Sequence, residues 1–307
     1  MPRTAMSLSL AAAVLSSHAA HATLVQVDTP LGSFTMEMRP QDAPLTVNNF
    51  LRYIADGDYN DSFIHRSADI TVEDPDNPGS FISQDFVIQG GGYTSGPRGF
   101  VVEDGAFVDI FNVPTDPPVQ NEPGVSNTRG TVAMAKQSGN PNSATSQWFV
   151  NVNDNSGGPA SLDTQNGGFT VFADVIEGMD VVDAIASLSV ANLGGAYSTI
   201  PILDTAAPPV LDKDEIVLTT LRVVGDATGD AYVGANDLDI LLANWGQTVT
   251  ANDFSAGDFD GDGTVGQGDL DIVAAQWGEG LTPAAVPEPA SALLVLGGVG
   301  LLARRRR

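Results

Sequence analysis

The sequence predicts a mainly β fold, a closed barrel with two helices, followed by a small α-helical module. Three observations support this prediction. Short runs of alternating apolar and polar residues recur from residue 23 to 224. Only two segments in this part have the apolar spacing of a helix. Beyond it, the chain repeats itself at an offset of 32 residues. With 307 residues, of which 42% are hydrophobic, the chain can form about two domains with real cores.

The first and larger part contains the predicted strands and both predicted helices. The alternating runs lie at residues 24–27, 33–38, 169–175 and 216–224. One helix is expected over 46–55, where Phe50, Leu51 and Ile54 share a face, and the other over 179–185. Many strands with two helices favour a closed barrel with the helices as plugs.

Charge and composition exclude several classes of function. The 38 acidic residues outnumber the 13 basic ones, for a net charge of −25, so nucleic acid is not an expected partner. The chain has no cysteine, which excludes thiol chemistry and disulfides. Only His65 remains if the first 22 residues are removed, so no mechanism or metal site can use two histidines.

Residues 1–22 are typical of a secretory signal peptide. Arg3 gives a charged start, residues 8–15 are apolar, and Ala20-His21-Ala22 offers a small-x-small cleavage site. The alternative is a buried N-terminal helix. We therefore expect export through the inner membrane.

The C-terminal segment, residues 281–307, contains Pro287-Glu288-Pro289, an apolar stretch over 290–302 and four final arginines. Thirteen residues of helix span about 20 Å, less than the roughly 30 Å of a bilayer core. The three-part order resembles the PEP-CTERM sorting signal of Gram-negative bacteria. That resemblance implies an exosortase-type processing enzyme and a final location in the periplasm, cell envelope or extracellular matrix. The alternative is a short transmembrane anchor.

The repeat over residues 225–280 is acidic and pairs two loops with two helices. Thirteen of 22 aligned positions are identical between 225–246 and 257–278. Carboxylates at loop positions 1, 3, 5 and 12 can surround Ca²⁺. Each loop precedes a helical pattern, Leu238, Leu241, Leu242 and Trp245 in the first unit and Leu270, Val273, Ala274 and Trp277 in the second. We expect these apolar faces to pack on each other.

This pattern resembles the dockerin type I module, which binds structural Ca²⁺ and cohesin modules. The resemblance implies these metal ligands: Asp226, Asp230, Asp237, Asp258, Asp260, Asp262 and Asp269. The first loop departs from the pattern at Thr228 and at Ala231, where the second has Gly263, so it should bind more weakly. The resemblance also implies that a cohesin would be read by Ala235, Asn236, Gln267 and Gly268, which lie late in each loop or early in each helix. The alternative is a pair of solvated acidic turns without metal.

Five motifs occur in order within residues 23–224. They are Tyr59-x-x-x-Phe63-Ile64-His65-Arg66, Phe86-Val87-Ile88-Gln89-Gly90-Gly91-Gly92, Gly130-Thr131-Val132-Ala133-Met134-Ala135, Asn142 to Asn151 with Gln147-Trp148-Phe149, and Phe169-Thr170-Val171-Phe172-Ala173 with Gly178-Met179. This order resembles cyclophilin, the peptidyl-prolyl cis–trans isomerase family with a closed eight-stranded barrel. The resemblance implies rotation about X–Pro bonds of polypeptide clients, with no cofactor and no covalent intermediate.

The resemblance also implies the site residues. Arg66, Gln89 and Phe149 would be catalytic. The substrate would be bound by Phe86, Val87, Ala135, Lys136, Gln147, Leu162 and Phe169. His65 matches a structural histidine beside the arginine. Gly90 to Gly92 predict a turn, since no P-loop lysine follows them.

One departure from the family is large. Nineteen residues, Ser67 to Asp85, separate Arg66 from Phe86, where the family usually has four. We expect an acidic loop that shades the groove or restricts substrates. Two functions follow from the sequence: an exported isomerase acting on envelope or extracellular clients, or a non-catalytic binder of proline-containing segments displayed through the repeat module.

Overall fold

The computed structural model describes residues 22–281, apart from 75, 101, 104–105 and 204–210. The predicted signal peptide and the predicted sorting segment therefore lie outside the described residues, except for Ala22 and Leu281 at their inner ends. Within the described part, no helix has the length and apolar character needed to cross a bilayer.

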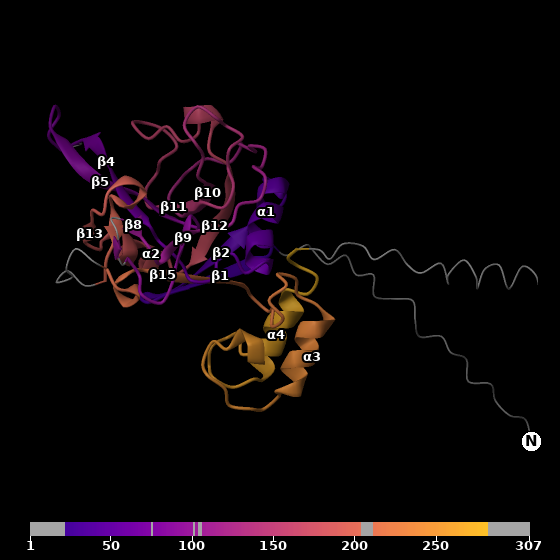
Figure 1. The fold of residues 1–307 in the computed structure, drawn as a ribbon. Coiled ribbons are helices and arrows are strands. Elements are labelled where there is room, and N and C mark those ends of the chain that lie inside the picture. The colour runs from indigo at the N-terminus through magenta and orange to yellow at the C-terminus, as the bar shows by residue number, and fades with distance from the viewer. Residues whose placement is uncertain (1–21, 75, 101, 104–105, 204–210, 282–307) are drawn as a thin grey trace, which may run out of the picture.

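A mainly β architecture forms the larger part of the molecule (Figure 1). One sheet of 11 strands runs in the order β4-β5-β11-β10-β12-β2-β1-β15-β3-β6-β9. The bounds are β4 Arg66–Glu73, β5 Phe81–Gly90, β11 Trp148–Asn151, β10 Thr131–Met134, β12 Val171–Glu177, β2 Gly32–Met38, β1 Leu24–Thr29, β15 Leu218–Val223, β3 Ser62–Phe63, β6 Tyr93–Ser95 and β9 Ile110–Asn112. Two separate two-stranded sheets are also present. One pairs β13 Val190–Ala191 with β14 Ile200–Pro201, and the other pairs β7 Val102–Glu103 with β8 Ala106–Phe107.

Both helices predicted for this part are present. Helix α1, Pro44–Ala55, starts with a proline, whose fixed φ suits the first turn of a helix. It buries Phe50, Leu51 and Ile54, the face expected from the sequence. Helix α2, Met179–Ala186, buries Val182 and Ile185.

The expectation of a closed eight-stranded barrel is wrong. The sheet is larger and open, because its end strands β4 and β9 do not pair with each other. The physical reason lies at Ile64 and His65, where the chain changes partner. The Ile64 N–H donates to Val217 O and the His65 N–H to Gln89 O, so the chain leaves β3 on one side and enters β4 on the other. The two ends of the sheet are therefore linked here by the backbone of Ile64 and His65 and not by hydrogen bonds between neighbouring strands.

The strands divide their side chains among three apolar clusters, one of which lies around Phe63 and Phe100 near β3 and β6. Alternate residues such as Ile88, Trp148, Val150 and Phe172 enter the main core, under α1 and α2. The other face of β4, β5, β10 and β11 carries a smaller cluster around Phe149. This second cluster positions the site described below.

The long insertion after Arg66 is an extended hairpin and not a loop. Strands β4 and β5 pair in register from Arg66 opposite Gln89 to Glu73 opposite Phe81, with a bulge after Ala68. Figure 1 shows this ribbon projecting from the body of the molecule.

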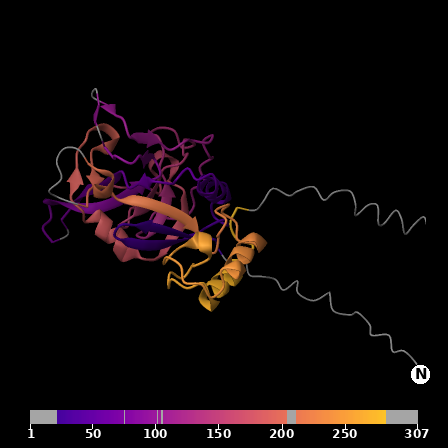
Figure 2. The same ribbon diagram turned by 60° about the horizontal axis from the view of Figure 1, so that its bottom comes forward.

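The C-terminal module contains two short helices, α3 Ala235–Ala243 and α4 Gln267–Ala275, which lie side by side (Figure 2). The predicted packing faces are only partly buried. Leu241 and Val273 are buried, whereas Leu242, Trp245 and Trp277 are 52%, 46% and 43% exposed. Each helix ends after nine residues, at Ala243 and Ala275, so the predicted i+7 tryptophans lie beyond the helices.

Arg222 of β15 joins the module to the sheet. Its guanidinium pairs with Asp28 of β1, donates to Asn252 O at 3.0 Å and lies 4.4 Å from the centre of the Phe254 ring. Burial acts to raise the pKa of Asp28, but hydrogen bonds from Ser33, Gln26 and Arg222 outweigh it and lower that pKa. The module is also joined to the sheet by hydrogen bonds from the Leu24 N–H to Gln276 Oε1 at 3.0 Å and from the Gly280 N–H to Thr23 Oγ1 at 2.9 Å.

Candidate functional site

The predicted catalytic residues lie in one row across three adjacent strands. Strand pairing places Arg66 opposite Gln89 and Gln89 opposite Phe149. The next strand adds Ala133, opposite Phe149. Because directly opposite residues of paired strands share a face, these side chains all point to the outer face of the sheet.

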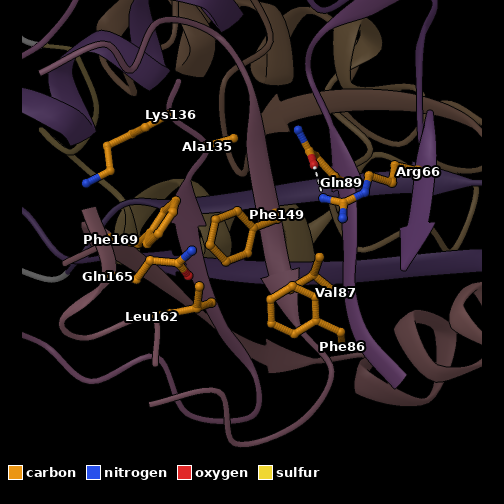
Figure 3. Close-up of a pocket in the computed structure, with 10 residues that line it drawn as sticks. All are labelled: Arg66, Phe86, Val87, Gln89, Ala135, Lys136, Phe149, Leu162, Gln165 and Phe169. Atoms are coloured by element: carbon orange, nitrogen blue, oxygen red, sulfur yellow. Dashed lines mark hydrogen bonds between the residues drawn. The ribbon is translucent and has the colours of Figure 1, made fainter. Parts of the chain in front are cut away.

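The row opens into a pocket of about 300 Å³ (Figure 3). Nine of the ten predicted site residues line it. The lining residues are Arg66, Phe86, Val87, Gln89, Ala135, Lys136, Phe149, Leu162, Gln165 and Phe169. Segments from residue 66 to residue 169 thus converge on one site, as the sequence motifs predicted.

Arg66 is fixed by a short chain of amide hydrogen bonds. Its Nη1 donates to Gln89 Oε1 at 3.2 Å, and Gln89 Nε2 donates to Gln147 Oε1 at 2.7 Å. Gln147, the tenth predicted residue, therefore supports the site from behind Gln89 and does not line the pocket. Burial lowers the pKa of Arg66, but an arginine stays protonated in proteins. Since its acceptor is an uncharged amide, this contact leaves the positive charge available to a ligand.

The floor and wall opposite Arg66 are apolar. Phe149 and Phe169 meet edge to face, with ring centres 5.8 Å apart. Val87, Phe149 and Leu162 are at least 95% buried. The Phe169 N–H donates to Leu162 O at 2.8 Å, which fixes the two residues beside each other. The pocket can hold a small apolar ring.

Lys136 supports the rim. Its ammonium donates to Asn121 Oδ1 at 3.2 Å and to the backbone oxygens of Asn166 and Gly168, and it lies 4.6 Å from the centre of the Phe169 ring. Figure 3 shows the ammonium beyond Phe169, away from Arg66. The side chain therefore holds the 165–168 turn in place.

Gln165 is the lining residue that the sequence analysis missed. It begins a 3-10 turn, Gln165–Gly167, between two motifs. No motif position pointed to it, and only the packing of this turn against Phe169 brings it to the pocket.

The glycines at the end of β5 form the predicted turn. Gly91 has φ +72°, and a Cβ there would lie 2.6 Å from Ser146 O and 2.7 Å from the Trp148 ring. Only glycine fits this approach, which keeps Gln89 and Gln147 within hydrogen-bonding distance.

His65 is buried behind the site and stays neutral. Burial, together with the positive charge of Arg66, lowers its pKa to about 3, although a hydrogen bond with the Phe63 backbone acts in the opposite direction. Its ring lies edge to face with Tyr93, with centres 5.0 Å apart. His65 therefore does not provide an acid or base near neutral pH.

His65 should make folding stability depend on pH. Its folded-state pKa of about 3 lies below the 6.5 of the unfolded chain, so the unfolded state takes up a proton first and stability is lost as pH falls below 6.5. Between pH 7 and pH 5, the free energy of unfolding of wild type should fall by about 2 kcal/mol more than that of His65→Phe, which has no histidine to protonate. Urea unfolding at both pH values measures this. An equal difference at the two pH values would show that His65 titrates normally.

The carboxylates of the second repeat loop gather at one point. Ligand atoms of Asp258, Asp260 and Asp262 lie within 4.8 Å of one another. Asp258 is fully buried, and its Oδ1 has no hydrogen-bond partner. Asp269 is also fully buried and closes the loop, accepting from the N–H groups of Phe259, Asp260 and Gly266. A buried carboxylate oxygen without a partner is costly unless a cation approaches it.

The first repeat loop is arranged differently. Both oxygens of Asp226 accept backbone N–H groups, at Gly229 and Ala231, and Asp237 accepts from Ala227, Thr228 and Gly234. Asp230 accepts from the Tyr232 N–H. Among the residues that the structure describes, the only cluster with metal-ligand spacing is that of the second loop. Ala231 has a left-handed backbone conformation, with φ 59°. Its equivalent in the second loop, Gly263, has φ 79° and adopts this conformation without the strain that a side chain adds.

The fold and the pocket together place an apolar cavity beside a fixed positive charge. The family model for "Cyclophilin type peptidyl-prolyl cis-trans isomerase/CLD" matches residues 24–207. A peptidyl-prolyl cis-trans isomerase of Acinetobacter baylyi is 35% identical over 191 residues, covering 62% of this chain and 85% of the relative. Peptidyl-prolyl cis-trans isomerase B of Escherichia coli is 35% identical over 203 residues, covering 65% and 99%. Peptidyl-prolyl cis-trans isomerase A of Dickeya dadantii is 34% identical over 214 residues, covering 68% and 93%.

The chain belongs to the cyclophilin-type peptidyl-prolyl cis–trans isomerase family. It is an enzyme that catalyses isomerisation of peptidyl-prolyl bonds, a reaction that needs no cofactor. The predicted enzyme class is confirmed, and of the predicted fold class the mainly β, cyclophilin-like domain is confirmed.

Proposed function

We propose that the protein is an exported isomerase that rotates X–Pro bonds of envelope or extracellular clients in the Arg66 pocket. The observation that carries the proposal is the Arg66–Gln89–Gln147 chain beside an apolar pocket lined by Phe149. It combines one fixed donor with one apolar receptor, which is what the reaction requires.

The chemistry is rotation without bond making. An X–Pro amide resists rotation by about 18–20 kcal/mol because rotation breaks amide resonance. As the bond twists, the prolyl nitrogen regains a lone pair that can accept a hydrogen bond. A donor placed at that nitrogen stabilises the twisted state more than either planar isomer, and this difference accelerates the reaction.

Each side chain has a distinct part in this mechanism. Phe149, Leu162 and Phe169 hold the proline ring, so that the rest of the chain must turn relative to it. The Arg66 guanidinium donates to the twisted amide. Gln89 keeps Arg66 in position, and Gln147 keeps Gln89 in position. The two amides therefore reduce the reorganisation that Arg66 undergoes when substrate binds.

The C-terminal module supports a second part of the proposal. We propose that the second loop binds Ca²⁺ through Asp258, Asp260, Asp262 and Asp269, as in dockerin-like modules, and that Asp226, Asp230 and Asp237 bind it more weakly. The unpartnered Asp258 Oδ1 supports this assignment. The cation would neutralise buried charge and stabilise the module. The exposed Leu242, Trp245 and Trp277, with exposed Ala235, Asn236, Gln267 and Gly268, offer a surface for a cohesin-like partner.

Export rests on the terminal segments. We propose signal-peptide removal after Ala22 and processing of residues 281–307 by an exosortase-type enzyme. Mass spectrometry of the protein recovered from a Gram-negative host with such an enzyme tests both steps. Export predicts a mature chain that begins at Thr23 and lacks the last arginines, and an intact chain in the cytoplasm would contradict it.

A further inference from the structure

The Arg66 pocket contains one polar side chain that the proposed reaction leaves without a role. Gln165 lines the pocket and is exposed, and its side-chain amide has no hydrogen-bond partner among the residues that the structure describes. Figure 3 shows this amide beside Phe169, directed toward Phe149 and on the side of the pocket away from Arg66. It therefore offers two donors and an acceptor to a ligand that enters the pocket.

The other polar side chains that line the pocket already have partners. The amide oxygen and the amide nitrogen of Gln89 are both hydrogen-bonded. The Lys136 ammonium has three donors and makes three hydrogen bonds, all of them to the rim. Of the polar side chains that line the pocket, Arg66 and Gln165 thus keep donors for a ligand, and they lie on opposite sides of it (Figure 3).

The turn that carries Gln165 is fixed from outside the pocket. Asn121 Nδ2 donates to the backbone oxygens of Gly167 and Gly168, at 3.0 and 2.9 Å. The Gln165 N–H donates to Ser161 O at 2.8 Å. These bonds hold the backbone and leave the side-chain amide free. A ligand that pairs with the amide therefore has to order one side chain and not a loop, which keeps the entropic cost of the contact low.

We infer that Gln165 is a specificity-determining residue, whose amide donates to the backbone carbonyl of the residue that follows proline in the substrate. In the proposed mechanism Arg66 faces the prolyl nitrogen. The ring carbon next to that nitrogen carries the following residue, which we place on the side away from Arg66, where Gln165 lies. The inference rests on this placement of the X–Pro bond. It makes the enzyme selective for proline within a chain over proline at its C-terminal end.

The test measures kcat and KM of the full chain for acetyl-Ala-Ala-Pro-amide and acetyl-Ala-Ala-Pro-Ala-amide, which differ by one residue after proline. Gln165→Ala removes the amide, and Gln165→Glu keeps the shape of the side chain but has no donor when ionised. The matched control is Thr164→Ala, an exposed neighbour that does not line the pocket and whose hydroxyl donates to Ser161 O within the turn.

We expect wild type to favour the longer peptide about fivefold in kcat/KM, the effect of one neutral hydrogen bond. Both Gln165 variants should bring the ratio of the two kcat/KM values close to one, by raising KM for the longer peptide while its kcat stays the same. Thr164→Ala should keep the wild-type ratio.

The inference would be overturned by a wild type without preference, by a preference that survives in Gln165→Glu, or by one that Thr164→Ala also removes. An equal loss on both peptides in Gln165→Ala would overturn it as well, because the contact would then lie elsewhere on the substrate. Full turnover of both peptides by Arg66→Ala would instead overturn the assignment of the pocket, which is a separate failure.

Discussion

Arg66→Ala should lower kcat/KM for a short X–Pro peptide by about two to three orders of magnitude, equivalent to about 3–4 kcal/mol of transition-state stabilisation. In the proposed mechanism the guanidinium donates chiefly to the twisted amide, so its loss should raise the barrier more than it weakens substrate binding. A protease-coupled isomerisation assay on the full chain measures the rate.

A conservative variant separates charge from geometry. Arg66→Lys keeps the charge and loses the fork that reaches both Gln89 and the substrate, so its rate should lie between those of wild type and Arg66→Ala. The urea midpoint should change little in both variants, because the Arg66 side chain is only partly buried and is hydrogen-bonded to an uncharged amide. Wild-type rates in Arg66→Ala would show that the pocket works without this donor.

Removal of Ca²⁺ should produce the second large effect. Asp258 is a fully buried carboxylate with an unpartnered oxygen, close to Asp260 and Asp262, and the proposed Ca²⁺ would neutralise this cluster. Repulsion among the three carboxylates should destabilise a module with only a small core. At a thousandfold excess over Kd, Ca²⁺ should add about 4 kcal/mol to the stability of the module. Thermal unfolding of the full chain, followed by circular dichroism in Ca²⁺ and in chelator, measures this.

Two isosteric variants assign the effect to a loop. Asp258→Asn keeps the shape of the side chain and removes its charge, so most of the Ca²⁺-dependent stabilisation should disappear. Asp226→Asn is the matched control. It should remove less of the Ca²⁺-dependent stabilisation, because both oxygens of Asp226 already accept backbone N–H groups within the first loop. The same unfolding curve in Ca²⁺ and in chelator would refute the metal assignment for both loops.

The residues that line the Arg66 pocket could be predicted from the sequence because nine of them belong to ordered motifs or were assigned from the family resemblance. Arg66, Gln89 and Phe149 lie about 20 and 60 residues apart in the chain, yet strand register places them in one row. The sequence did not distinguish Gln147 as a support from the residues that line the pocket. That distinction depends on a side-chain hydrogen bond to Gln89, which no spacing rule predicts.

Other features depended on tertiary context. The open sheet results from a change of partner at Ile64 and His65, a local event without a sequence signature. The insertion was expected to be an acidic loop because it exceeds the family pattern by fifteen residues, but its flanks, 69–73 and 81–85, pair as strands. In the module, helical spacing placed Trp245 and Trp277 on the apolar faces, whereas the helices end before them.

Exchange spectroscopy by NMR on an Ala-Pro peptide tests the central claim most directly. With a catalytic amount of the full chain, cross-peaks between the cis and trans resonances should appear on a timescale at which the free peptide shows none. They should vanish with Arg66→Ala and persist in chelator, because the pocket needs no metal. Peptide shifts that change on binding without exchange cross-peaks would contradict the account and leave a protein that binds proline-containing segments without isomerising them.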